Sequence, residues 1–480
     1  MMARAALIGT MLALSACSFA PPYKTPNSAP PAAVYKEGDW KPAEPQDSQP
    51  RGAWWVIFQD PALDGLEAQA ADANQDLKAA YARLLQARAA TRIARADLFP
   101  TLNIGSSATR SRTSVNSPTF PKGAEPVGNN FDLEADLSYE IDVWGRVRNA
   151  VASARANQQA SAADLATLKL AIQAELAGDY FTLRSQDTQR QLLDQTVEDY
   201  TRALQLTQNL YNGGAAALTD VAQAQAQLET ARTQAADIRL QRAQSEHAIA
   251  VLLGQNPSAF HMDANPLAVS AVPPPIDPGL PSSLLERRPD VAAAERRTAA
   301  ANAQIGVARA AYFPVFSLAA AGFDSTSASN WLTAPSQLWS AGPAAGVLTV
   351  FDAGRHRAQS AQAKAAYDEQ VADYRTTVLT AYREVEDNLA ALGQLQQESV
   401  SEAAAVKATA TALEQAQYRY KAGLVTYLEV STAENSALQA QLANVTIQLR
   451  RLSASVLLVK ALGGGWRNGE LSAEATAPSH

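Results

Sequence analysis

The feature that most constrains the fold is an internal duplication. The two halves of the chain share short motifs at a constant separation of 209 residues. A further motif, ARADLFP at 94–100, recurs as ARAAYFP at 308–314, but 214 residues later. The first half therefore holds five extra residues, which we expect to lie in a loop. The motifs at the constant separation are Gly-Arg (145–146 and 354–355), Tyr-x-x-Gly (211–214 and 420–423) and Leu-Gly (253–254 and 462–463).

Each half is predicted to contain a helix that leads to the Phe-Pro motif, a strand-like section and two long helical tracts separated by a glycine-containing break. In the third tract, apolar residues from Val371 to Leu392 recur at spacings of three and four, which is typical of a helix face packed on a neighbour. A helix of about 65 residues is roughly 100 Å long, so we expect an elongated fold. The four predicted tracts are 145–210, 218–253, 355–419 and 428–462.

The segment FDLEADLSYEIDVW (131–144) alternates apolar and polar residues, which predicts a strand with one apolar and one wet face. Further strands are predicted at about 101–112, 315–325 and 341–351. Four strands cannot close a membrane barrel alone, so we predict a mainly α fold whose β-barrel portion is shared between chains. The alternative is a half-buried strand in a soluble sheet. The acidic side chains predicted to face a barrel lumen are Asp132, Glu134, Asp136 and Glu140.

The chain contains one cysteine, Cys17, which follows a short basic start and an apolar stretch. This stretch is too short to span a membrane, and the layout is that of a secretory signal peptide. The ending Leu-Ser-Ala-Cys matches the bacterial lipoprotein signal, in which the cysteine sulfur receives a diacylglycerol and the new amine an acyl chain. The alternative is an ordinary signal peptide with an incidental cysteine. Ser18 at the next position is compatible with transport to the outer membrane.

These patterns divide the chain into six parts. A proline-rich tether follows the signal peptide, and a second proline cluster separates the two repeats. The parts are a signal peptide (1–16), a lipidated tether (17–53), a first repeat (54–270, with strands at about 101–144), a linker (271–281), a second repeat (282–464) and a tail (465–480).

Composition argues against several other functions. Forty basic and 47 acidic residues give a net charge of −7, without the basic excess typical of nucleic-acid binding. The four histidines lie far apart in the sequence, which has no phosphate-binding loop and no zinc-protease motif. We therefore predict no enzymatic activity, no metal and no cofactor other than the acyl chains on Cys17.

Four segments resemble the outer-membrane factor (TolC-like) family of tripartite efflux pumps, and especially its lipoprotein branch. The resemblance covers 54–464. It implies a homotrimer in which twelve strands form one barrel in the outer membrane and twelve long-helix columns form a tunnel across the periplasm. The segments are WWVIFQDPALDGL (54–66), LSYEIDVWGRVRNAVASA (137–154), LLERRPDVAAAERRTAAANAQIGVARAAYFP (284–314) and RYKAGLVTYLEV (419–430).

The resemblance also implies a function and partners. Members conduct drugs or other toxic compounds passively from the periplasm to the exterior, which leads to multidrug resistance. A periplasmic adaptor protein and a proton-driven inner-membrane transporter complete such a pump. Two alternatives remain: a duct of the same fold for secreted proteins, and a non-conducting coiled-coil lipoprotein of the envelope. The second alternative does not explain the alternation at 131–144.

The two glycine-containing breaks indicate helix C-caps followed by an N-cap threonine or acid. The resemblance implies that they form a periplasmic tip, where the tunnel closes and the adaptor docks. Glu429 then either joins a cation-binding ring of three carboxylates or stabilises a helix N-terminus, and the second role is favoured for Asp220. The predicted tip residues are Tyr211, Gly213, Gly214, Thr219, Asp220, Tyr420, Gly423, Thr426 and Glu429.

Overall fold

The chain folds into two compact units. The strand unit comprises 1–28, 83–162 and 293–375, and the helical unit comprises 29–82, 163–292 and 376–480. Cys17 and the tail 465–480 lie outside the described residues. The computed structural model describes residues 18–27, 52–121, 123–267, 273–274, 276, 288–318, 321–325, 327, 329, 333–339 and 345–464.

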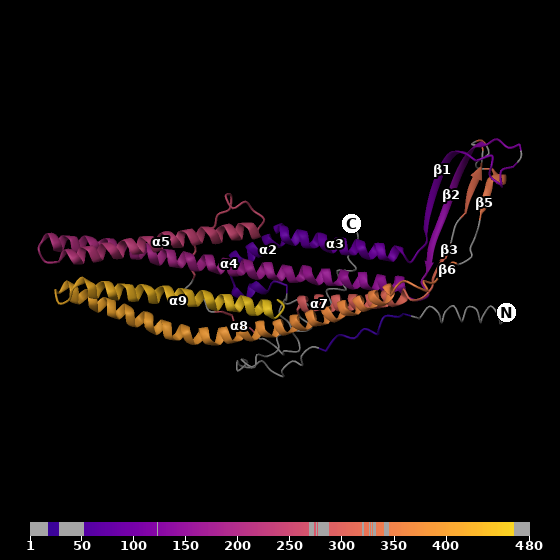
Figure 1. Ribbon diagram of the computed structural model, residues 1–480. Coiled ribbons are helices and arrows are strands. Elements are labelled where there is room, and N and C mark those ends of the chain that lie inside the picture. Colours follow the sequence, from indigo (N-terminus) through magenta and orange to yellow (C-terminus); the bar gives the residue numbers. More distant parts are fainter. Residues whose placement is uncertain are drawn as a thin grey trace. The chain divides into compact units, whose positions relative to one another are not determined.

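Helices make up most of the described chain, and the predicted long tracts are confirmed to within two residues at each end (Figure 1). None of the helices in the described ranges combines the length and apolar character needed to cross a membrane. The helices are η1 (Trp54–Phe58), α2 (Pro61–Ala73), α3 (Gln75–Ala96), α4 (Arg146–Asn212), α5 (Leu218–Leu252), α7 (Pro289–Ala310), η3 (Ala334–Ser336), α8 (Arg355–Lys421) and α9 (Tyr427–Ala461).

The duplication extends to the backbone. Helices α4 and α8 begin and end 209 residues apart, as do α5 and α9. Gly145 and Gly354, which precede α4 and α8, both have positive φ, at 76° and 88°. Glycine adopts this region without the steric cost borne by other residues, so the repeated glycines place equivalent helix starts after each strand section.

The sheet of the strand unit has four positions across its width, which we call lanes. They correspond to the four predicted strands, although two of the lanes each consist of two short strands. Strands β1 (Thr101–Arg112) and β2 (Val127–Ile141) pair over their length. The third lane consists of β3 (Val315–Leu318) and β4 (Ala321–Ser325), which both pair with β2. The fourth lane consists of β5 (Gln337–Trp339), paired with β4, and β6 (Ala345–Val347), paired with β3. All of these pairings are antiparallel.

Two predicted strand ranges were wrong in their bounds. The fourth strand, predicted at 341–351, has strand residues at 337–339 and 345–347, and 348–351 are not strand. The second strand was predicted to continue to 144 but ends at Ile141, because Asp142 caps the next helix instead. Its carboxylate accepts hydrogen bonds from the backbone nitrogens of Val147, at 3.1 Å, and Arg148, at 2.8 Å.

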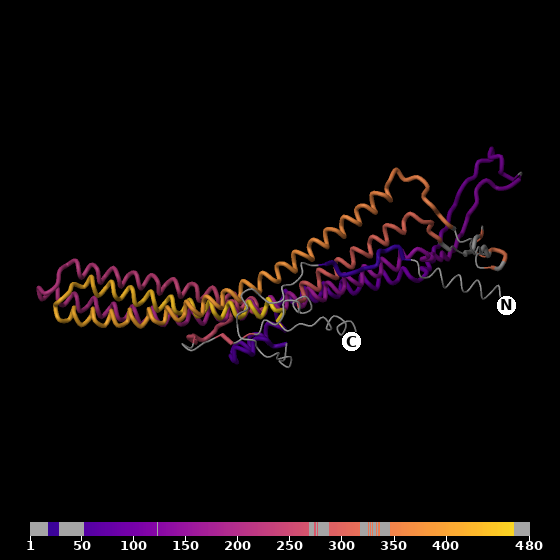
Figure 2. Tube along the Cα trace, turned by 90° about the horizontal axis from the view of Figure 1, so that it is seen from below, coloured from indigo at the N-terminus to yellow at the C-terminus, as the bar shows by residue number. Residues whose placement is uncertain are grey.

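In the helical unit, α4 pairs with α5 and α8 pairs with α9, and the two hairpins lie side by side (Figures 1 and 2). The turns of both hairpins lie at the same end of this unit (Figure 2). Its largest apolar cluster includes Trp54, Leu63, Tyr180, Ile249 and Val456, so α2, α4, α5 and α9 share one core. This cluster holds α4, α5 and α9 together far in sequence from the hairpin turns.

Candidate functional site

The two hairpin turns have the same backbone geometry. In the first, the nitrogen of Gly214 donates to the carbonyl of Tyr211 at 2.9 Å, and that of Ala215 to Leu210 at 2.8 Å. The same bonds recur 209 residues later, from Gly423 to Tyr420 and from Leu424 to Arg419, both at 2.9 Å. These two hydrogen bonds, donated by a left-handed residue and by the residue after it, form the Schellman motif. The φ values of Gly214 and Gly423, 77° and 72°, confirm the prediction of C-cap glycines.

The prediction of an N-cap threonine was wrong for Thr219. The N-cap of α5 is Ala217, and Thr219 lies inside the first turn of the helix. Asp220 accepts a bond from the backbone nitrogen of Ala217, at 3.3 Å. It thereby satisfies one of the free donors at the helix start, which is the role favoured for it from the sequence. Thr426 is the N-cap of α9, but its side chain makes no capping bond.

Glu429, in the first turn of α9, pairs with Arg419 at the end of α8. Its Oε1 accepts from Nη1 of Arg419 at 2.5 Å, and both side chains are about half exposed. The positions 209 residues earlier hold Asp220 and Leu210, so the first turn cannot form this ion pair. The pair bridges the turn of the second hairpin, and exposure keeps its stabilising contribution small.

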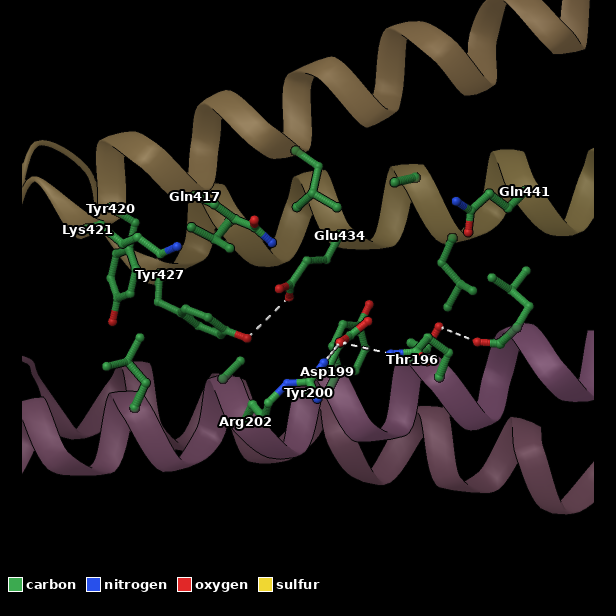
Figure 3. A pocket seen from close by; sticks show the side chains of 18 residues that line it. Thr196, Asp199, Tyr200, Arg202, Gln417, Tyr420, Lys421, Tyr427, Glu434 and Gln441 are labelled. Carbon is green, nitrogen blue, oxygen red and sulfur yellow. Dashed lines mark hydrogen bonds and ion pairs between the residues drawn. The ribbon is translucent and has the colours of Figure 1, made fainter.

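A cleft of about 590 Å³ lies beside the turns, between α4 on one side and α8 and α9 on the other (Figure 3). Its lining includes Tyr200 from α4, Tyr420 from α8, and Tyr427 and Glu434 from α9. The hydroxyl of Tyr427 donates to Oε2 of Glu434 at 3.2 Å. The Tyr420 and Tyr427 rings meet edge to face, with centroids 5.6 Å apart. The cleft therefore contains a buried carboxyl group among aromatic rings.

The sequence interpretation missed Glu434 and Tyr200. Glu434 is 8 % exposed although it is a glutamate. Its burial, together with the nearby charge of Asp199, raises its pKa to about 7. A signal was available in the sequence: Tyr427, Val430 and Glu434 follow the spacing of three and four that marks a packed helix face. A carboxyl group on such a face is a candidate for a perturbed pKa.

The first two strands present one apolar and one polar face. Their register pairs Leu102 with Leu137 and Ile104 with Ala135 on one side of the sheet. Ile104 is 74 % exposed and Leu102 63 %. In isolation such a surface is unusual for a protein that faces only water.

The predicted lumen acids share the opposite face of β2. Asp132, Glu134 and Asp136 lie across from small or polar residues of β1, and Glu140 lies across from Ser317 of β3. Asp132 accepts from the Ser107 hydroxyl at 2.8 Å. Glu140 forms two bonds with Arg146, at 2.7 and 2.5 Å, and thereby joins the end of β2 to the start of α4.

The residues that follow Cys17 dock on the strand unit. The Phe19 ring stacks on Phe313, with centroids 4.5 Å apart and planes 4° from parallel, and also lies 6.0 Å from Trp144. The Tyr23 hydroxyl donates to Oε1 of Glu295 at 2.8 Å, and Asn302 donates to the carbonyl of Pro21 at 2.8 Å. Residues 18–27 thus form a strap of defined position, which we call the N-terminal strap.

The described residues contain no group of three or more histidine, cysteine or acidic side chains arranged to hold a metal ion.

The tip residues Tyr211, Gly213, Gly214, Thr219 and Asp220 belong to the first turn region, and Tyr420, Gly423, Thr426 and Glu429 to the second. The structure therefore brings the two predicted tip groups to the same end of the helical unit (Figure 2).

The chain matches the family model described as outer membrane efflux protein over residues 66–255 and 280–464. It is 35 % identical over 475 residues to the probable efflux pump outer membrane protein SepC of Pseudomonas putida, covering 96 % of each chain. It is 33 % identical over 471 residues to the pyoverdine export outer membrane protein OpmQ of the same species, covering 96 % of this chain and 97 % of that one.

Solved structures agree with this likeness. The outer-membrane channel OprN has a TM-score of 0.84 and 32 % identity, over 94 % of this chain and 100 % of that one. The CmeC outer membrane channel of Campylobacter jejuni has a TM-score of 0.87 and 26 % identity, over 96 % and 98 %. The chain therefore belongs to the outer membrane efflux protein family and is the outer-membrane channel component of an efflux pump.

Proposed function

We propose that three copies of this chain form one conduit, in which small toxic molecules pass from the periplasm to the exterior without chemical change. The observation that carries the proposal is the two-faced strand pair: Leu102 and Ile104 are exposed on one face, and the acids of β2 line the other. With four lanes per chain, three chains supply twelve strands, enough to close a barrel with the apolar face toward lipid.

Reconstitution in planar lipid bilayers tests this function. Discrete, long-lived conductance steps and passage of small solutes are expected from the purified trimer. A protein that binds membranes but never conducts supports the non-conducting envelope lipoprotein instead. A protein-secretion duct is favoured if the open state passes folded polypeptides as readily as small solutes.

In this proposal the hairpin turns are the periplasmic end of the conduit and the docking site of an adaptor, which links it to a proton-driven transporter in the inner membrane. The matching Schellman turns at Gly214 and Gly423 support the proposal, because no Cβ shields their backbone from an approaching helix. Co-purification with a periplasmic adaptor protein from the same organism is the direct measurement. Failure of the wild-type trimer to retain that adaptor contradicts this part of the proposal.

We further propose that Glu429 contributes to a ring of three carboxylates that binds cations at the constriction. The ion pair with Arg419 holds this carboxylate at the turn. Divalent cations are expected to block wild-type conductance, and Glu429→Gln is expected to lose both the block and cation preference. If Glu429→Gln matches wild type in conductance and in block, Glu429 serves only the helix start.

Lipidation of Cys17 completes the proposal. The docked N-terminal strap supports it, because Ser18, the residue that follows Cys17 in the sequence, donates to Oδ1 of Asn149 near the start of α4. Cys17→Ala, exported behind an ordinary signal peptide, is expected to trimerise and to fractionate with the outer membrane, since strands already hold it there. Full solubility of this variant in the periplasm contradicts the barrel, whereas loss of labelled palmitate alone identifies the lipid site.

A further inference from the structure

Glu434 lies where the two helix hairpins meet. It projects from α9 toward α4, and Tyr427 on the same helix holds its carboxyl group at 3.2 Å (Figure 3). Tyr427 is 1 % exposed and belongs to an apolar cluster that also contains Ala203 and Leu204 of α4, Ala224 of α5 and Ala416 of α8. The contact between the hairpins near the turns is therefore built around the Tyr427–Glu434 pair.

The surroundings of Glu434 disfavour a negative charge. From α4 it faces Asp199 and Tyr200, and Asp199 is itself paired with Arg202. From α8 the cleft receives Tyr420 and Lys421, none of the described α5 residues lines it, and Ala224, Leu228 and Ala231 of α5 belong to the apolar clusters beside it. The Tyr200 hydroxyl is buried and has no hydrogen-bond partner among the described residues. Only Tyr427 donates a hydrogen bond to the carboxylate within this set, so the ionised form is poorly satisfied.

We propose that Glu434 is a proton-operated latch, which holds α9 against α4 beside the turns while its carboxyl group is neutral and releases the second hairpin when it ionises. The inference rests on the proposed channel function and adds a regulator to its periplasmic end. A neutral carboxyl group stays buried between Tyr427 and the rings of the cleft. Ionisation brings a second negative charge close to Asp199, on a side chain that is only 8 % exposed.

The sign and size of the effect follow from proton linkage. Burial raises the pKa of Glu434 from 4.5 to about 7 in the packed arrangement, and exposure on release returns it toward the lower value. The packed form therefore binds more protons between these limits. The ratio of released to packed hairpins grows roughly ten-fold per pH unit from 4.5 to about 7, and stays level above that. The whole change is about two orders of magnitude.

Distances between spin labels on the exposed Gln208 of α4 and Asn435 of α9 measure the latch directly in the reconstituted trimer. In wild type, a longer distance is expected to gain population as the pH rises from 5 to 7. Glu434→Gln, which stays neutral, is expected to keep the short distance at both values. Tyr427→Phe removes the hydrogen bond that favours ionisation, so its transition is expected at higher pH than in wild type.

Glu414→Gln is the matched control, because Glu414 lies exposed on α8 and its loss is expected to leave the transition unchanged. Identical distance distributions in wild type and Glu434→Gln at pH 5 and pH 7 overturn the latch, as does a Tyr427→Phe transition at lower pH. Conductance recorded on the same samples distinguishes failure of the latch from failure of the proposed channel function. Current without a Glu434-dependent transition rejects the latch alone, whereas absence of current at every pH rejects the proposed channel.

Discussion

Glu67 on α2 is expected to make the helical unit less stable as the pH rises. The residue is fully buried, and neither of its carboxyl oxygens has a hydrogen-bond partner among the residues that the structure describes. Burial, together with the charge of Asp64 one turn earlier, raises its pKa from 4.5 to about 9. The native chain therefore holds a proton that the unfolded chain has already released at neutral pH.

The magnitude follows from this difference in proton binding. Between pH 4.5 and about 9 the native state binds more protons than the unfolded state, so the free energy of unfolding falls as the pH rises. Each unit contributes about 1.4 kcal/mol, which amounts to about 3 kcal/mol per chain between pH 4.5 and pH 7. Glu67→Gln has no proton to lose, so its advantage over wild type is expected to grow by this amount.

Urea unfolding followed by tryptophan fluorescence provides the assay, because Trp54 lies in the core of the same unit. Wild type, Glu67→Gln and the exposed control Asp72→Asn, also on α2, are compared at pH 5, 6, 7 and 8. The wild-type and control profiles are expected to fall together while the Glu67→Gln profile stays higher with rising pH. Parallel profiles for wild type and Glu67→Gln refute the reasoning, since they place an ionised carboxylate in the native core.

Two further predictions concern stability in the same unit. Gly254→Ala is expected to cost more than Gly214→Ala, although both glycines have positive φ, at 65° and 77°. A Cβ added at residue 254 would lie 2.6 Å from the carbonyl oxygen of Ala73, the last residue of α2. A Cβ added at residue 214 would meet no described atom within 4 Å. About 1 kcal/mol is expected at 214 and clearly more at 254, measured by urea unfolding. Arg242→Met is expected to cost about 3 kcal/mol, because buried Arg242 binds Asp187 at 2.7 Å and a backbone carbonyl at 2.6 Å. The exposed Arg232→Met should cost under about 1 kcal/mol in the same assay, and equal losses contradict the burial argument.

Much of the fold is predictable from sequence because local signals and the duplication agree. Helix α8 ends where Gly423 permits a left-handed turn, and α4 ends at the equivalent Gly214. The alternation predicted the end of the second strand wrongly at Asp142, because a polar residue in a period-two pattern and a helix-capping aspartate look alike in the sequence. The bounds of the fourth strand were predicted wrongly because Gly342, Pro343 and Gly346 weaken any strand signal in that segment of the sequence.

The chemistry of the turns was less predictable, because it depends on pairs that only the folded hairpins bring together. Arg419 and Glu429 are ten residues apart, and the Schellman turn at Gly423 reverses the chain between them. Glu434 acquires its raised pKa from burial at the contact between the hairpins, and to a smaller extent from the charge of Asp199 on α4, more than two hundred residues earlier in the chain. No local pattern in either repeat specifies which of its acids will face the other hairpin.

The duplication itself indicates where the two hairpins have diverged. Their backbones end and turn at equivalent residues, so the geometry of the turns cannot distinguish them. Their side chains do, because the ion pair of Glu429 and the buried pair of Tyr427 and Glu434 both belong to the second hairpin. The equivalent of Glu429 in the first hairpin, Asp220, bonds instead to its own helix start. A regulated movement is therefore expected in α8 and α9, with α4 and α5 as the surface against which they are held.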